Sequence, residues 1–311
     1  MHNSIFTRFK SNSDYIKLTF GERVQKIAIN TGYLCPNRDG SKGIGGCTYC
    51  NISSIRPDYA YSKKSITEQI KEGIDFFSHK NKTKKYIVYF QSYTNTYQDS
   101  EELIKDYQEA LSYPNVLGLI IATRPDCLPL KIVEYLSEIA KTKYIAIELG
   151  IESTNDQTLL KINRCHTYAE TIAAYKLLNQ NNLNLGGHII IGLPGENNED
   201  IINHAKLISK LPLKQLKIHH LQILKHTQMA KEFALNVDSF KLFNQESYLN
   251  IVIAFLEYLR PDITIQRFVA ESPKDILIAP QWNGLRNRDF TKLVEQKMIE
   301  LDTWQGKLYS S

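Results

Sequence analysis

Several features are missing from this 311-residue sequence, and each absence narrows the class of protein. No apolar run approaches the eighteen or so residues that a membrane-spanning helix requires. The first residues contain neither a continuous apolar stretch nor a small-residue cleavage site, so we expect no secretory signal. No repeat, low-complexity tract or flexible linker divides the chain. The sequence therefore predicts an ordinary globular protein without a membrane segment.

Cysteine is scarce as well, with five residues in the whole chain. Three of them, Cys35, Cys47 and Cys50, fall within one short segment. An odd total with this crowding argues against the disulfide framework of a secreted protein. It favours a metal site in a reducing compartment, and we therefore expect a cytoplasmic protein.

Neither sign of charge dominates the sequence. The net charge is +5, with 23% charged and 42% hydrophobic residues. A mildly basic balance permits a nucleic-acid partner but does not demand one, because solvated surfaces of this charge are common.

Short β-branched runs alternate with longer amphipathic stretches along the chain. This alternation predicts right-handed βαβ units around a parallel sheet, and six units suit a partial (β/α)6 TIM-like barrel better than a closed one. The predicted strands are Val24–Asn30, Tyr86–Gln91, Leu117–Thr123, Tyr144–Gly150, Leu185–Gly192 and Gln215–Leu221. The predicted helices lie near residues 65–79, 99–112, 130–141, 167–182 and 198–210.

The pattern changes after residue 225. A helix near 244–260, a seventh strand at Ile263–Val269 and a final helix near 286–300 are expected there. We interpret residues 1–225 as the barrel core and residues 226–311 as a C-terminal α/β extension that covers one side of the barrel.

The three crowded cysteines directly follow the first predicted strand, in a C-x11-C-x2-C pattern. Functional groups gather at the carboxyl ends of parallel strands, so this loop should lie at the mouth of the barrel. Thiolates are the ligands that iron–sulfur clusters select. Three cysteines ligate three irons of a 4Fe–4S cubane and leave the fourth iron open. An open iron can chelate S-adenosylmethionine (SAM) and transfer an electron to its sulfonium, which gives a 5′-deoxyadenosyl radical.

A structural zinc site is the alternative interpretation of the same cysteines. Such a site needs four protein ligands. The loop contains no histidine and no fourth cysteine, and the next histidine, His79, falls within a predicted helix.

At this point the sequence resembles the radical SAM superfamily, and more closely its YtqA/YhcC-type branch, which is related to the radical SAM part of the elongator catalytic subunit. The resemblance covers nearly the whole chain. It runs through KLTFGERVQKIAINTGYLCPNRDG, GGCTYCN, FQSYTNTY, TRPDCLP, IELGIES, INRCHTY, GGHIIIGLPGE and IQRFVAESP.

The resemblance implies a set of SAM-binding residues. Tyr49 resembles the aromatic residue near the adenine, although it could simply cover the cluster. The stretch after the second strand stands where many relatives carry Gly-Gly-Glu for the SAM amino group, and here hydroxyl and amide groups replace the glutamate. The fifth-strand segment resembles the motif that supports the adenine. The residues implied by these last two segments are Gln91, Ser92, Thr94, Asn95, His188 and Gly192.

Glu148 and Glu152 flank the end of the fourth predicted strand and should share one face of it. They could reach the SAM ribose or a basic group of the substrate. The alternative is a buried carboxylate that pairs with Arg124 from the neighbouring strand end.

The remaining cysteines and histidines have weaker assignments. Cys127 is a candidate hydrogen-atom donor or substrate contact, but a small buried hydrophobic residue is the commoner role for cysteine. Cys165 is assigned no role. Of the neighbours His219 and His220, one should face into the barrel and the other away.

Three hypotheses for the function follow. The first, from the resemblance, is an enzyme that converts 5-carboxymethylaminomethyluridine to 5-aminomethyluridine at the tRNA wobble position, with a reduced flavodoxin or ferredoxin as electron donor. The second is a radical SAM enzyme acting on a small molecule or peptide. The third is a nucleic-acid-binding module with a structural metal. Contacts to RNA phosphates are compatible with the run at residues 80–85 and with Arg56, Arg164, Arg267, Arg286 and Arg288.

Overall fold

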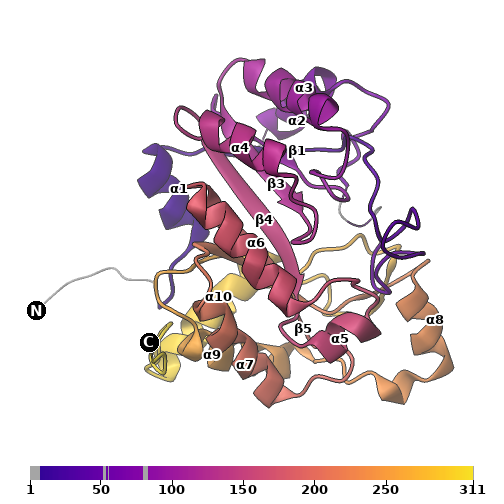
Figure 1. Ribbon diagram of the computed structural model, residues 1–311. Helices are drawn as coiled ribbons and strands as arrows, with labels where there is room; N and C mark the ends of the chain where they lie inside the picture. The colour runs from indigo at the N-terminus through magenta and orange to yellow at the C-terminus, as the bar shows by residue number, and fades with distance from the viewer. Residues whose placement is uncertain (1–7, 52–53, 55, 80–82, 311) are drawn as a thin grey trace, which may run out of the picture.

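The computed structural model describes residues 8–51, 54, 56–79 and 83–310. Its centre is a seven-stranded parallel sheet in the order β1-β2-β3-β4-β5-β6-β8. The sheet curves into a half-barrel with helices on its outer face (Figure 1). The strands of this sheet are β1 (Gln25–Ile29), β2 (Tyr86–Phe90), β3 (Val116–Thr123), β4 (Tyr144–Glu152), β5 (Asn184–Ile191), β6 (Gln215–His220) and β8 (Thr264–Arg267).

Helices connect and cover these strands. The helices are α1 (Asn12–Phe20), α2 (Ile66–Ser78), α3 (Ser100–Ser112), α4 (Leu130–Ile139), α5 (Asp156–Lys161), α6 (Tyr168–Gln180), α7 (Asn198–Ser209), α8 (Gln228–Leu235), α9 (Gln245–Tyr258) and α10 (Asn287–Glu300). A short antiparallel pair, β7 (Ile223–Leu224) and β9 (Leu277–Ala279), lies outside the main sheet.

Both faces of the sheet are buried, which explains why its strands are almost continuously apolar. On β3, Leu119 and Ile121 face the outer helices and join the main hydrophobic core. Ile120 and Ala122 alternate with them and belong to a smaller cluster on the inner face. The inner surface of the sheet is therefore partly apolar, and the polar side chains on it are candidates for a functional role.

The amino-terminal helix α1 closes the bottom of the half-barrel. The ring of Phe20 packs edge-on against Tyr144, with 5.1 Å between ring centroids. The hydroxyl groups of Tyr15 and Tyr144 are 3.2 Å apart, and Tyr144 also accepts a hydrogen bond from Gln215 at 2.9 Å. These contacts form a floor, so the interior opens toward the carboxyl ends of the strands.

The six predicted strands and the five predicted helices of the core are confirmed, with ends shifted by a few residues. Ser65 and Glu68 form a capping box at the start of α2. Helices α1, α5 and α8 and the β7–β9 pair were not predicted. They are short, and four of these five elements have at most eight residues, too few for a clear period.

The C-terminal segment also contributes to the half-barrel. Strand β8 pairs in parallel with β6 and becomes the seventh strand of the main sheet. The sheet thus extends across residue 225, and the division of the chain at that residue remains a prediction. No helix in the described residues is long and apolar enough to cross a membrane.

Candidate functional site: a cysteine-lined cavity in the half-barrel

The cysteine loop follows β1 and folds back on itself through backbone hydrogen bonds. The amide of Arg38 donates to the Cys35 carbonyl at 2.8 Å, and the amide of Cys50 donates to the Cys47 carbonyl at 3.0 Å. The amide of Gly46 donates to the Asn37 carbonyl at 2.7 Å. These short-range bonds bring residues that are up to fifteen positions apart to one side of the loop. All three thiols line the same cavity.

The segment after α5 anchors this loop from the other side of the barrel. The amide of Thr48 donates to the Ile162 carbonyl at 3.0 Å. The side-chain amide of Asn163 donates to the Gly46 carbonyl at 2.9 Å, and the side chain of Asn37 donates to the Asn163 carbonyl. The sequence INRCH is therefore a support for the cysteine loop.

Gly43 lies where the two segments meet. A Cβ atom at this position would lie 2.1 Å from the Asn37 carboxamide oxygen and 2.8 Å from the Cys165 sulfur. The Cys165 thiol donates to the same Asn37 oxygen at 2.9 Å. The absence of a side chain at residue 43 thus allows Asn37 to reach both Asn163 and the cysteines.

Polar groups surround the cysteine sulfurs. The Cys47 sulfur lies 3.5 Å from the Asn37 amide nitrogen and 3.6 Å from the Arg164 guanidinium. The guanidinium of Arg38 donates to the Cys50 carbonyl at 3.2 Å. Burial, with the neighbouring Cys47 adding to the effect, raises the pKa of the Cys50 thiol to about 11. A bound metal reverses this preference, because coordination deprotonates a thiol.

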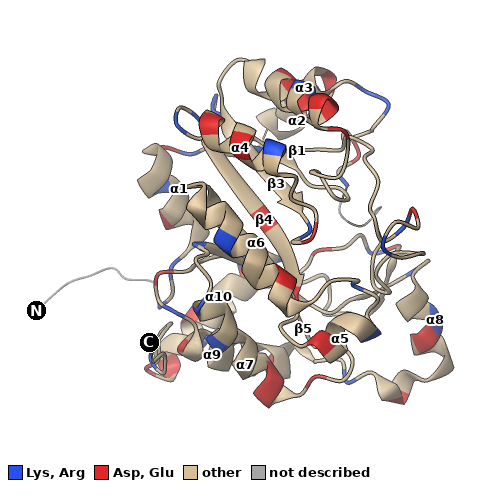
Figure 2. Cartoon of the chain, in the orientation of Figure 1, with Lys and Arg blue, Asp and Glu red and all other residues tan. Residues whose placement is uncertain are grey.

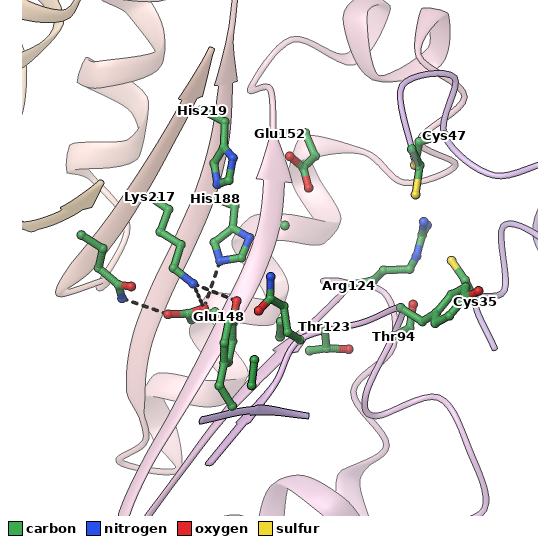
Figure 3. A pocket seen from close by; sticks show the side chains of 18 of the residues that line it. Cys35, Cys47, Thr94, Thr123, Arg124, Glu148, Glu152, His188, Lys217 and His219 are labelled. Atoms are coloured by element: carbon green, nitrogen blue, oxygen red, sulfur yellow. Dashed lines mark hydrogen bonds and ion pairs between the residues drawn. The ribbon is translucent and has the colours of Figure 1, made fainter. Parts of the chain in front are cut away.

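The cavity occupies about 460 Å³ inside the half-barrel. This volume lies within the range of about 300–1,000 Å³ that is typical of small-molecule sites. Figure 3 shows the thiols of Cys35 and Cys47 on one side and the group around Glu148 on the other. We name these regions the cysteine end and the inner end.

Arg124 points toward the thiols from the end of β3 (Figure 3). Its Nε and Nη2 atoms donate to the two carboxylate oxygens of Asp126 at 2.9 Å each, and Nη2 also donates to the Arg164 carbonyl. Although burial alone raises the pKa of Asp126, Arg124 lowers it to about 2. The Nη1 atom of Arg124 is buried and has no hydrogen-bond partner in the described part of the chain. This unsatisfied donor faces the region where an anionic group would gain a charge-assisted bond.

Glu148, on β4, is the centre of the inner end. Its Oε2 atom accepts hydrogen bonds from Lys217 and from His188, the latter at 3.0 Å, and its Oε1 atom accepts one from Gln266 at 2.9 Å. Burial alone would raise the pKa of Glu148, but the charges of Lys217 and Lys26 hold it well below its usual range. Glu148 is therefore ionised and fully engaged.

Glu152 lies four residues further along β4, nearer the cysteines, and lines the same cavity. The strand register shifts between Gly150 and Glu152, and Glu152 has a left-handed backbone with φ 64°. One carboxylate oxygen of Glu152 lies 3.6 Å from the Arg164 guanidinium. Non-glycine residues with positive φ are uncommon and often mark functional positions.

The alternative assignment of Arg124 as the partner of a buried glutamate is wrong. Arg124 pairs with Asp126, whereas Glu148 pairs with Lys217 and Glu152 faces Arg164. The reason is local geometry, since Asp126 is only two residues away and meets the guanidinium in a bidentate manner.

The predicted SAM-binding residues separate into two groups. Tyr49, Gln91, Thr94, Glu148, Glu152 and His188 line the cavity together with the cysteines. Ser92 and Asn95 are buried outside its lining, and the Asn95 side chain instead joins β2 to β3 by donating to the Phe90 and Ala122 carbonyls. Gly192 lies on the other side of the sheet, next to Phe243.

The remaining predictions have clear structural outcomes. His219 lines the cavity, whereas His220 stacks on Trp282 at 4.1 Å on the outer side, as the strand alternation predicts. Cys127 is buried in a separate hollow beside Asp126 and does not line the main cavity. Burial raises its pKa to about 12.

The basic residues expected to contact RNA phosphates lie in different environments. Arg164 is buried and donates to the Gly150 carbonyl and to His166, so its assignment to an RNA surface is wrong. Arg267 lines the cavity, and Arg286 and Arg288 are exposed. Residues 80–82 of the basic run lie outside the described residues. In Figure 2 acidic and basic residues are interspersed over the helices that face the viewer.

Sequence reasoning missed several residues of this cavity, above all Lys26 and Lys217. Both interrupt strands that are otherwise apolar, in the sequences QKIAI and QLKIHH. A lysine inside a buried strand is rarely tolerated without a partner, so both lysines could have been predicted from the sequence as candidate site residues. Arg124 and Arg164 had no such signal, because both follow strand or helix ends where charged residues are common.

Comparison with known proteins agrees with this architecture. Residues 29–208 match the family model of the radical SAM superfamily, and residues 213–300 match the model of the radical SAM C-terminal domain. The chain is 31% identical over 302 residues to YtqA of Bacillus subtilis, which covers 97% of this chain and 93% of that protein. It is 34% identical over 265 residues to YhcC of Escherichia coli, which covers 85% and 84% of the two chains.

More distant matches extend the comparison. The structure of an archaeal Elp3 from Methanocaldococcus infernus, truncated at its N-terminus, superposes with a TM-score of 0.68 at 17% identity. That match covers 91% of this chain and 64% of the Elp3 chain, and it shows a shared fold. A tRNA uridine(34) acetyltransferase of the same organism is 24% identical over 186 residues, which are 58% of this chain and 33% of that protein.

Proposed function

This chain belongs to the radical SAM superfamily, and we propose that it modifies the wobble uridine of tRNA, converting 5-carboxymethylaminomethyluridine to 5-aminomethyluridine. The observation that carries the proposal is the cavity itself, which combines three thiols at one end with polar and charged groups at the other. The superfamily uses SAM and a 4Fe–4S cluster, so the fit of these groups is the first question.

The cysteine end fits a cubane with an open iron. Cys35, Cys47 and Cys50 supply three thiolates, the number that leaves one iron free. No three His, Cys, Asp or Glu side chains among the described residues converge on a point that would suit a single ion. A cubane does not need such convergence, because each thiolate binds a different iron. Asn37 and Arg164 donate toward the Cys47 sulfur, as hydrogen bonds around cluster sulfurs commonly do.

When bound, SAM and the cluster would supply a 5′-deoxyadenosyl radical that can remove a hydrogen atom from a substrate C–H bond. The protein's own residues bind and orient SAM and substrate around this event. In our proposal the unsatisfied Nη1 atom of Arg124 binds an anionic group beside the cluster, such as the SAM carboxylate. Thr94 and Gln91 accept hydrogen bonds from the SAM ammonium, Glu152 binds the ribose hydroxyls, and Tyr49 covers the adenine.

The tRNA substrate is supported by sequence similarity to an enzyme that is named for its action on tRNA. A tRNA uridine(34) acetyltransferase matches 58% of this chain, and residue 34 is the wobble position. The match covers only a third of that enzyme, so its acetyl-transfer activity is not part of the proposal. In our proposal the cavity of about 460 Å³ receives a single nucleoside, which a base extruded from the anticodon loop would supply.

The proposed reaction is balanced with SAM as the two-electron oxidant. Loss of a hydrogen atom and one further electron from the methylene carbon between the amine and the carboxylate, followed by addition of water, cleaves the bond between this carbon and the nitrogen. The products are 5-aminomethyluridine, glyoxylate, methionine, 5′-deoxyadenosine and a proton. An external donor of the flavodoxin or ferredoxin type supplies the priming electron, which the substrate returns.

Mass spectrometry of tRNA nucleosides tests this proposal. In a strain that lacks the gene, 5-carboxymethylaminomethyluridine should accumulate and 5-aminomethyluridine should fall, and the wild-type gene should restore both. An unchanged wobble-uridine profile would count against the tRNA assignment and in favour of a small-molecule or peptide substrate. Anaerobically reconstituted protein should contain iron and sulfide; zinc without cluster absorbance would point to the non-catalytic hypothesis.

A further inference from the structure

Three basic side chains meet at the inner end of the cavity, each from a different strand. Lys26 lies on β1, Lys217 on β6 and Arg267 on β8, and all three line the cavity. Lys217 and Arg267 are direct partners in the register of β6 and β8. The amines of Lys26 and Lys217 lie 4.9 Å and 4.3 Å from the centroid of the Tyr89 ring. We call these three residues the cation cluster.

The cation cluster has more positive charge than its surroundings neutralise. Glu148 is the one carboxylate that lines this end of the cavity among the described residues. Its oxygens are already bonded to Lys217, His188 and Gln266. Among the described residues, Arg267 forms no side-chain hydrogen bond and no ion pair, and the Lys26 amine has one long hydrogen bond of 3.5 Å, to Gln266, besides its contact with the Tyr89 ring. One carboxylate thus faces three cations.

This excess of charge is costly in a partly buried site. Burial lowers the pKa of Lys217 to about 7, with Lys26 and Arg267 adding to the effect while Glu148 opposes it. Burial likewise lowers the pKa of Lys26, and Arg267 lowers it further. The neighbouring His219 has a buried Nε2 atom without a partner in the described chain. Like charges gathered in this way are stabilised when an anion enters.

The floor of the cavity restricts the kind of anion. A chain of hydrogen bonds runs from Tyr15 through Tyr144 and Gln215 to Gln266 beneath the cation cluster. A phosphodiester continues in both directions and cannot end at such a floor. A carboxylate at the tip of a base substituent can.

We propose that the cation cluster binds a carboxylate carried by the substrate, with Arg267 as its main contact. This inference rests on the proposed function, whose substrate ends in a carboxymethyl group. Glu148 and Glu152 are four residues apart on β4, or about 13 Å at 3.3 Å per residue. In this arrangement the inner end holds the carboxylate together with the adjacent methylene, which is the carbon that loses hydrogen, while the rest of the nucleoside extends toward the cysteine end.

Binding of two RNA probes to the reconstituted holoenzyme tests the site without relying on turnover. The probes are an anticodon stem-loop with 5-carboxymethylaminomethyluridine at the wobble position and the same stem-loop with its methyl ester. The wild-type protein should bind the acid about tenfold or more tightly than the ester, as expected for a charge-assisted hydrogen bond. In Arg267→Gln this preference should fall to about twofold or less.

A matched control separates the site from general charge effects. Arg288→Gln removes the same charge from an exposed position and should keep the acid preference. Because Arg267 has no internal partner among described residues, its replacement leaves no buried charge unpaired. Lys26→Gln provides a second variant in the same cluster and should also weaken the preference.

The outcomes distinguish the site from the reaction. Equal binding of acid and ester by the wild-type protein, or binding of neither, overturns the carboxylate site. A preference that survives in Arg267→Gln and Lys26→Gln also overturns it. Acid-dependent binding without any 5-aminomethyluridine product supports the site and contradicts the proposed reaction. Conversion of acid and ester at equal rates supports the reaction and contradicts the site.

Discussion

The two ends of the cavity are built in opposite ways. At the cysteine end the ligands come from a single loop of sixteen residues, Cys35 to Cys50, closed by its own backbone hydrogen bonds. At the inner end the polar groups come from several strands, from β1 to β8, and distant segments meet only when the sheet curves. The first end is local in sequence, and the second exists only in the folded protein.

This contrast suggests that the cysteine end serves the cofactor and the inner end serves the substrate. The cysteine end holds groups that the whole superfamily shares, so its composition says little about the substrate. The inner end offers charge and shape to a substrate, including a carboxylate, three cations and a His219 nitrogen without a hydrogen-bond partner among the described residues. If the division is real, each end can be disabled while the other keeps its property.

Cys47→Ala should have the largest effect. Loss of one thiolate leaves the cluster with two ligands, and SAM cleavage should fall by about a thousandfold or more, to the background of the assay. Formation of 5′-deoxyadenosine measures the loss. The acid preference of the RNA probes should persist, because it depends on the other end.

Cys127→Ala is the matched control for that experiment. Cys127 is buried in a separate hollow, so its replacement should retain iron, sulfide and SAM cleavage. Sustained 5′-deoxyadenosine production by Cys47→Ala would contradict the assignment of the cluster. Loss of the acid preference in the same variant would contradict the independence of the two ends.

Glu148→Gln should have the next largest effect, now on stability. Glu148 and Lys217 are almost completely buried, and the substitution leaves the Lys217 ammonium without its anionic partner. Breaking a buried pair in this way costs about 3–5 kcal/mol. Urea unfolding of the holoenzyme measures the change.

An exposed carboxylate serves as its control. Glu138→Gln removes a partner of Lys141 at the protein surface and should change the free energy of unfolding by less than about 1 kcal/mol. Iron content should be the same in both variants. A Glu148→Gln protein as stable as the wild type would mean that Glu148 and Lys217 are not the ionised pair described above.

The contrast between the ends also explains what could be predicted from the sequence. The cysteine ligands can be predicted because they are close together in the sequence. The strands can be predicted because each is a short apolar run. The cation cluster required knowing that β8 joins the sheet beside β6, which places Arg267 next to Lys217. Gly192 lies outside the cavity lining, and a position at a strand end does not by itself specify the face.

Gly43→Ala should have an intermediate effect confined to the cysteine end. The new methyl group would overlap the Asn37 carboxamide, which must then move away from Asn163 and the Cys47 sulfur. We expect about 1–3 kcal/mol of destabilisation, as for other overpacked sites, and a several-fold lower yield of cluster on reconstitution. Iron and sulfide analysis after reconstitution measures this yield.

Gly40→Ala separates the clash from backbone strain. Gly40 has a φ of 92° and open space around its Cα, so alanine there adds strain without displacing Asn37. Cluster yield in Gly40→Ala should remain closer to that of the wild type. Equal yields in the two variants would argue that Asn37 does not organise the loop.

Lys42→Met should have the smallest effect, and its pH dependence is diagnostic. Lys42 is 36% exposed and lies 2.7 Å from Asp126, which keeps its bidentate partner Arg124 in the variant. The loss of unfolding free energy at neutral pH should therefore stay below about 1 kcal/mol.

Asp126 has a pKa lowered from 3.8 to about 2, so its ion pairs stabilise the fold above about pH 4 and lose that contribution as the pH falls toward 2. The difference in unfolding free energy between the two proteins should consequently shrink over this window. Because both carry the same cluster, its own sensitivity to acid cancels in the difference, and a gap that widens toward low pH would contradict the pairing of Lys42 with Asp126.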